Sequence, residues 1–211
     1  MFQGIRKHFG AARTVAAVHS LASVATLGHA LRHPDRWDAL CLFDPPIMPP
    51  AGHPLHEIQQ ADMDSLAARA MRRQEVYDSP EQLAAQFRRR ASFSRWVPEG
   101  ADLLARHTLR RRPDGRWTLC CPPAFESDVF RNNVDPTLFP RLGEIRVPLR
   151  IVAGDPDSPY TSPAARIAKS AREMFGVEYA MVPGTTHFLQ IEEPQRCRDL
   201  LIEFLTRNGL H

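Results

Sequence analysis

The stretch from residue 13 to residue 22 (RTVAAVHSLA) constrains the fold of this chain more than any other. An apolar run with strand character, residues 14–18, stops at Ser20. Apolar residues then recur at helical spacing at Val24, Leu27 and Leu31. A strand, a sharp turn and a helix that begins at a serine place the hydroxyl clear of the backbone. Ser20 is therefore either an exposed nucleophile or a helix cap.

The rest of the chain alternates strands and helices at its two ends. We predict strands at 37–43, 147–153 and 177–182, a helix from Ser162 to Gly176 and a last helix from Pro194. Residues 2–12 are compatible with a further short helix. Alternating strands and helices predict an α/β fold, a parallel sheet with helices on both faces.

A different composition separates the second predicted strand from the third. Residues 45–141 are rich in proline, arginine and short helical patterns, with helix starts at Ser79 and Pro98 and a hairpin pattern at 109–121. We therefore expect a core formed by residues 1–44 and 142–211, with a mainly helical insertion over the edge where the strands end.

Charge and composition exclude several classes of function. The chain has 27 basic and 24 acidic residues, no run long enough to span a membrane and no signal-peptide core, so we expect a cytoplasmic protein. Arginines cluster at 88–90 and 110–112 without a nucleic-acid-binding motif, which predicts a solvated surface. The four cysteines form no C-x-x-C pair, so we expect free thiols and no zinc site.

Polar residues follow three of the predicted strands. Ser20 follows the first, Asp155 and Asp157 follow the third, and His187 follows the fourth. Parallel strands bring their carboxyl ends to one edge of a sheet, so these residues can meet there. A histidine can take the proton of a serine, and a carboxylate fixes the tautomer of that histidine. Asp157 is the expected carboxylate, with Asp44 and Asp155 as alternatives.

Four stretches carry a resemblance to a known superfamily: VHSLA at 18–22, RHPDRWDALCLFDP at 32–45, VPLRIVAGDPD at 147–157 and PGTTHFLQIEEP at 183–194. Together they cover about a fifth of the chain, and in order and spacing they resemble an α/β-hydrolase of the esterase, lipase and lysophospholipase-like group. The resemblance implies Ser20 as nucleophile, His187 as general base, Asp157 as orienting acid and the Leu21 N–H as an oxyanion donor. It also implies that residues 45–141 form a lid.

This resemblance implies a serine hydrolase that cleaves a carboxylic ester, thioester or lysophospholipid-like small molecule through an acyl-enzyme, with no metal and no organic cofactor. The sequence leaves the oligomeric state open. The elbow departs from the small-residue pattern of the superfamily at Val18, and the strands that normally precede the elbow have no counterpart. Alternatives are therefore an inactive, truncated or degenerate member that acts as a binding protein or is a fragment, and a carbon–carbon bond hydrolase or amidase of the same fold.

Overall fold

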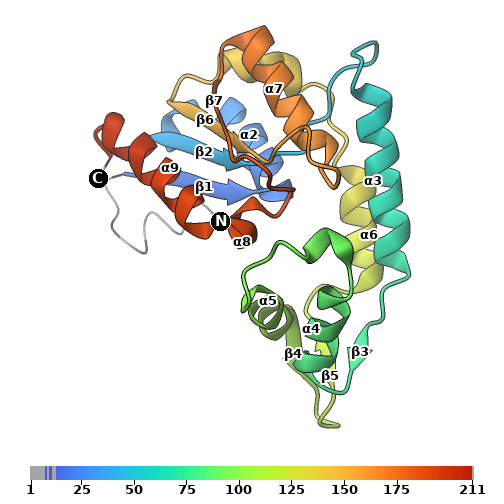
Figure 1. The fold of residues 1–211 in the computed structure, drawn as a ribbon. Coiled ribbons are helices and arrows are strands. Elements are labelled where there is room, and N and C mark those ends of the chain that lie inside the picture. Colours follow the sequence, from blue (N-terminus) through green and yellow to red (C-terminus); the bar gives the residue numbers. More distant parts are fainter. Residues whose placement is uncertain (1–7, 9, 11–12, 211) are drawn as a thin grey trace.

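A four-stranded parallel sheet forms the centre of the protein in the computed structural model, which describes residues 8, 10 and 13–210 (Figure 1). Its strand order is β1-β2-β6-β7. The four strands are β1 Val15–His19, β2 Ala39–Phe43, β6 Leu149–Ala153 and β7 Glu178–Met181. All four run in one direction, so the residues that follow them gather at one edge.

Helices cover both faces of this sheet, which confirms the predicted α/β fold. Helices α2 (Leu21–Arg32) and α7 (Pro163–Phe175) pack on one face, and α9 (Pro194–Arg207) packs on the other (Figure 1). Strand β2 shows why both faces are apolar, because all five of its residues are buried. Leu40 and Leu42 join the core beneath α2 and α7, while the alternate residues of β2 face α9.

The chain between β2 and β6 builds a second group of elements, which lies beside and below the sheet in Figure 1. Three short strands pair there as an antiparallel sheet in the order β3-β5-β4. The elements are α3 His56–Met71, β3 Val76–Tyr77, α4 Pro80–Arg88, α5 Gly100–Thr108, β4 Leu109–Arg111, β5 Trp117–Leu119 and α6 Pro123–Asn132. The hairpin predicted at 109–121 corresponds to β4 and β5.

Helix α3 is the longest element that the sequence pattern did not predict. Its buried face carries Gln59, Met63, Ala67 and Ala70, so Met63 is the one large apolar side chain among them. The face is covered by α6 instead of by the sheet. A helix buried through alanines has little hydrophobic periodicity, which explains why the pattern missed it. The predicted helix at 2–12 falls mostly on residues outside those described.

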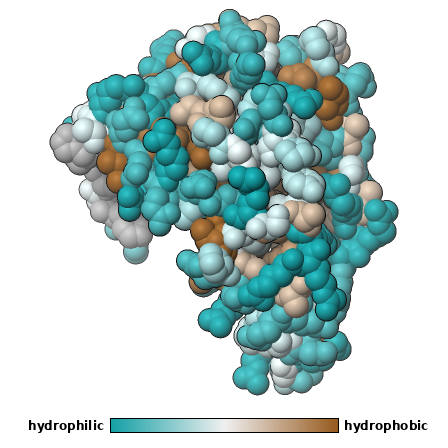
Figure 2. Space-filling model, viewed as in Figure 1, coloured by the Kyte–Doolittle hydropathy of each residue, from teal (hydrophilic) through white to brown (hydrophobic). Residues whose placement is uncertain are grey.

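Polar residues dominate the face of the molecule seen in Figure 2, with apolar residues scattered between them. None of the helices in the part of the chain that the structure describes is long and apolar enough to cross a membrane.

Candidate active site

Ser20 occupies the sharp turn between β1 and α2. Its backbone has φ 56° and ψ −128°, a conformation that non-glycine residues seldom adopt. Two hydrogen bonds hold the turn: the Ser20 N–H donates to the Phe43 carbonyl at 3.0 Å, and the Ser20 carbonyl accepts from Ser23 N–H at 2.9 Å. The hydroxyl makes no capping bond to the helix. It is therefore available for other contacts, and the half-buried Val18 does not prevent the turn.

His187 lies between this hydroxyl and a buried carboxylate. Its Nε2 is 2.9 Å from Ser20 Oγ, and its Nδ1 is 2.7 Å from Asp44 Oδ2. A carboxylate only accepts hydrogen bonds, so Nδ1 carries the proton and Nε2 is left to accept from the serine. The structure thus brings Ser20 and His187 together as predicted, although they are 167 residues apart.

The carboxylate beside His187 is that of Asp44, which corrects the prediction of Asp157. Asp44 directly follows β2, has φ 43° and is 0% exposed. Its other contacts are also donors: Gly154 N–H reaches Oδ1 at 3.1 Å, and Ser162 Oγ reaches Oδ2 at 2.9 Å. Three donors around a buried carboxylate compensate the loss of its water.

The other two aspartates serve the turn after β6. Asp157 is exposed there, and its N–H donates to Asp155 Oδ1 at 2.9 Å. Asp155 also accepts from Gly184 N–H at 2.8 Å. These two backbone hydrogen bonds hold the pKa of the Asp155 carboxyl below its ordinary value. Asp155 therefore ties the β6 turn to the loop that carries His187.

Leu21, the predicted oxyanion donor, is the first residue of α2. The first amides of a helix have no partner within the helix and point along its axis, where the helix dipole favours negative charge. The Leu21 N–H therefore lies at the N-terminus of α2, one residue after Ser20.

The loop that carries His187 is anchored by a buried glutamate. Glu192 of helix α8 (Leu189–Glu192) is 6% exposed and accepts from Thr186 N–H at 2.6 Å and from Thr186 Oγ1 at 2.5 Å. Gly154 lies against the same loop, because a Cβ atom built on it would be 2.5 Å from the Thr186 carbonyl oxygen. The backbone of Thr186, the residue before His187, is therefore held by Glu192 and packed closely against Gly154.

Gly154→Ala is expected to lower both stability and hydrolysis. The added methyl group would meet backbone atoms of Thr186, which cannot move aside without displacing His187. Overpacking of this kind costs about 1–3 kcal/mol. Thermal unfolding measures the loss, and Gly143→Ala is the matched control, because its nearest contact would be 4.0 Å away. An unchanged melting temperature in Gly154→Ala would contradict this packing.

Aromatic side chains connect the His187 loop to the segment between β2 and β6. The Phe188 ring lies 5.4 Å from the Phe93 ring and 5.2 Å from the Trp96 ring, both edge to face. The Val97 N–H donates to the Ile191 carbonyl at 3.0 Å. Residues 93–97 therefore contact the loop that positions His187.

His19, the last residue of β1, packs against His187. Its Nε2 is 2.8 Å from the His187 carbonyl oxygen, and the two rings are 4.6 Å apart. Burial, followed by the nearby charge of His187, lowers the pKa of His19 from 6.5 to about 4, while the hydrogen bond to the His187 backbone and the charge of Asp44 oppose the shift. His19 is therefore uncharged near neutral pH.

The lowered pKa of His19 predicts a loss of stability in acid. Between pH 6.5 and about 4 the unfolded chain binds a proton at this position that the folded chain does not bind. The free energy of unfolding then falls with decreasing pH by roughly 1 kcal/mol per pH unit, and this fall ends below about pH 4. Denaturant titrations of wild type and His19→Gln measure the difference. Parallel pH curves for the two proteins would show that His19 titrates normally.

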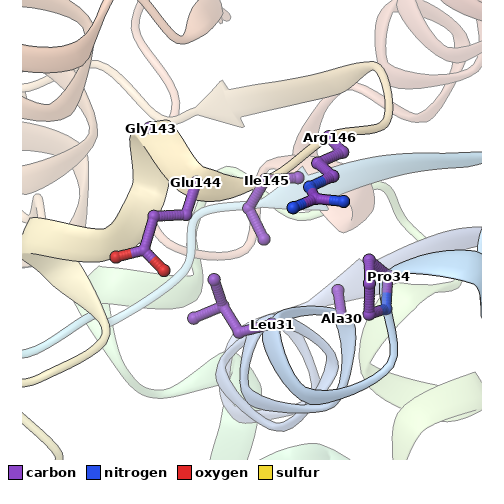
Figure 3. Close-up of a pocket in the computed structure, with 7 residues that line it drawn as sticks. All are labelled: Ala30, Leu31, Pro34, Gly143, Glu144, Ile145 and Arg146. Carbon is purple, nitrogen blue, oxygen red and sulfur yellow. The ribbon is translucent and has the colours of Figure 1, made fainter.

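No group of three or more metal-ligating side chains occurs in the described part of the chain. A surface cavity of about 420 Å³ lies where α2 ends and the chain approaches β6 (Figure 3). Leu31, Pro34 and Arg146 are among its lining residues. Since α2 begins at the Ser20 turn and this cavity lies at its other end, the cavity is remote from Ser20.

Two supporting residues were not recognised from the sequence. The sequence pattern places Ser162 at the start of a helix, where a serine is expected to cap the first turn, but its hydroxyl donates to Asp44 and makes no capping bond. The sequence gives no indication that Glu192 is buried, because glutamates before a proline-initiated helix are common at protein surfaces. For Asp44, the sequence indicates a site residue through its position directly after a buried strand.

Sequence comparison finds distant relatives. The chain is 25% identical over 226 aligned residues to the abhydrolase domain-containing protein ACTT2 of Alternaria alternata, which covers 90% of this chain and 82% of that protein. No family model matches the sequence.

Structural comparison identifies the fold. The structure of E-2-(acetamidomethylene)succinate hydrolase matches with a TM-score of 0.77 at 19% identity, over 97% of this chain and 70% of that one. A carboxylesterase structure from Nitrososphaera gargenis matches with a TM-score of 0.68 at 15% identity, over 98% and 70%. The protein has the α/β-hydrolase fold, as the sequence resemblance predicted.

Proposed function

We propose that this protein is a serine hydrolase that cleaves an ester or thioester of a small molecule through an acyl-enzyme. The observation that carries the proposal is the continuous hydrogen-bonded series from Ser20 Oγ through His187 to Asp44, at 2.9 Å and 2.7 Å. A serine hydroxyl is a weak nucleophile until a base takes its proton, and an oriented imidazole is such a base.

In the proposed reaction, Ser20 Oγ attacks the carbonyl carbon while His187 Nε2 takes the hydroxyl proton. The negative oxygen that forms is stabilised by the Leu21 N–H; one such donor is worth about a hundredfold to a thousandfold in rate. His187 then gives its proton to the leaving alcohol or thiol. A water molecule deprotonated by His187 releases the acyl group, and Ser20 recovers its proton.

Asp44 has the role of the orienting acid in this proposal. Its carboxylate keeps the proton on Nδ1 of His187 and stabilises the imidazolium that forms when the serine is deprotonated. Gly154 and Ser162 keep the carboxylate in place. The exposed Asp157 has no part in the step.

Residues 45–141 are proposed to be the lid that selects the substrate. The support is the contact of residues 93–97 with the His187 loop, through Phe188 and Ile191. Structures with the same fold include proteins described as a carboxylesterase and as a hydrolase of an acetamidomethylene succinate. The substrate of this chain depends on its own lid, because fold alone does not determine substrate.

A substrate panel tests the proposal. Short p-nitrophenyl esters, acyl thioesters and anilides are supplied to the wild-type protein, and product release is measured with each. We expect turnover of esters or thioesters, with anilides slower or inert. Preferential cleavage of anilides would favour the amidase alternative. Absence of turnover together with no reaction toward a fluorophosphonate probe would favour an inactive binding protein.

A further inference from the structure

His19 connects the Ser20 turn to the loop that carries His187. It immediately precedes the serine, and its Nε2 lies 2.8 Å from the His187 carbonyl oxygen, 168 residues away in the chain. Its ring packs against the rings of His187 and Phe188, at 4.6 Å and 6.2 Å. A single side chain thus contacts both the backbone and the ring of His187.

The chemistry of this contact defines the state of His19. A carbonyl oxygen only accepts hydrogen bonds, so Nε2 of His19 must carry the hydrogen. The titratable groups that face the ring are His187 and Asp44, and the lowered pKa of His19 leaves it neutral at working pH. A neutral donor suits this position, because His187 must become positively charged when it takes the proton of Ser20. A second cation at a ring separation of 4.6 Å would oppose that charge.

The hydrogen bonds that Asp44 and Glu192 make to this loop do not involve the backbone carbonyl of His187. Asp44 holds the His187 side chain, and Glu192 holds the preceding residue, Thr186. The carbonyl of His187 itself is bonded by His19. Ser20 and His187 lie on separate segments of the chain. The distance between Ser20 Oγ and His187 Nε2 therefore depends on contacts between these two segments.

We propose that His19 is a positioning residue that sets the distance between Ser20 Oγ and His187 Nε2 by holding the His187 carbonyl. This inference rests on the proposed function of Ser20 and His187. His19 itself does not transfer a proton to or from the substrate.

Three variants test the role of the His19 donor. His19→Phe keeps a ring but loses the N–H, His19→Leu loses both, and His19→Gln keeps an uncharged N–H at a reach similar to Nε2. A lost hydrogen bond of about 1–2 kcal/mol predicts that kcat for a p-nitrophenyl ester falls roughly 5- to 30-fold in His19→Phe and His19→Leu, with KM changed less. His19→Gln should recover most of this loss and keep the wild-type pH profile. Circular dichroism establishes that each variant is folded.

Different results would contradict the role of His19 and the proposed hydrolase function. Wild-type rates in folded His19→Phe or His19→Leu, or equal impairment of the Phe and Gln variants, would overturn the positioning role. A changed pH profile in His19→Gln would overturn it as well, because it would make His19 an acid or base. If wild type fails to react with a fluorophosphonate, the proposed function fails, and the His19 contact then has no catalytic meaning.

Discussion

Replacement of Ser20 by alanine is expected to abolish hydrolysis and leave the fold intact. The hydroxyl makes no bond to the α2 helix, so its removal costs the turn little. Without it, His187 has no nucleophile to deprotonate, and loss of a serine that acts in a triad typically lowers kcat by about 10⁶. Steady-state kinetics with a p-nitrophenyl ester measure the effect.

The matched control for this variant is Ser65→Ala, which removes an exposed serine from α3. Its rate should equal that of wild type, and both variants should melt close to the wild-type temperature. Retention of a substantial rate in Ser20→Ala would remove the serine from the chemistry, whatever its distance from His187.

Replacement of Asp44 by asparagine is the second change with a large expected effect. An asparagine keeps the size of the side chain, but if its amide nitrogen faces Nδ1 it favours the wrong tautomer of His187. A change of this kind in a Ser-His-Asp triad lowers kcat by about 10⁴. The donors Gly154 and Ser162 would also lose part of their acceptor. The ester assay and thermal unfolding together separate lost catalysis from lost folding.

Asp157→Asn is the control that distinguishes the structure from the sequence-based expectation. Asp157 is exposed in the turn after β6, and its carboxylate forms no hydrogen bond or ion pair with the residues that the structure describes, so its replacement should leave the rate close to wild type. A large loss in Asp157→Asn with normal rates in Asp44→Asn would mean that the acid follows β6 after all.

The sheet and its site were partly predictable from the sequence for a physical reason. Buried parallel strands are continuous apolar runs, so the sequence predicts strands at β2 and β6. The residues that follow parallel strands share one edge of the sheet. The pattern therefore predicts that Ser20 and His187 lie close together. It could not rank Asp44 against Asp157, since both follow strands. The choice depends on the turn geometry at Asp44, where φ is positive, and on the donors Gly154 and Ser162.

The segment between β2 and β6 was less predictable. Its helix starts at Ser79 and near Pro98 followed from capping chemistry, whereas α3 and α6 bury small and polar residues against each other. Contacts such as that of Phe188 with Trp96 join residues about 90 positions apart and leave no local signature. The hydrogen bond between His19 and the His187 carbonyl joins residues 168 positions apart and likewise leaves no local signature in the sequence.

The most direct test of the central claim is the site of covalent modification. Wild-type protein is treated with a fluorophosphonate, digested and sequenced by mass spectrometry. We expect one adduct, on Ser20, and a much slower reaction in Asp44→Asn. An adduct on any other residue, or a Ser20 adduct formed at the same rate without the Asp44 carboxylate, would contradict it.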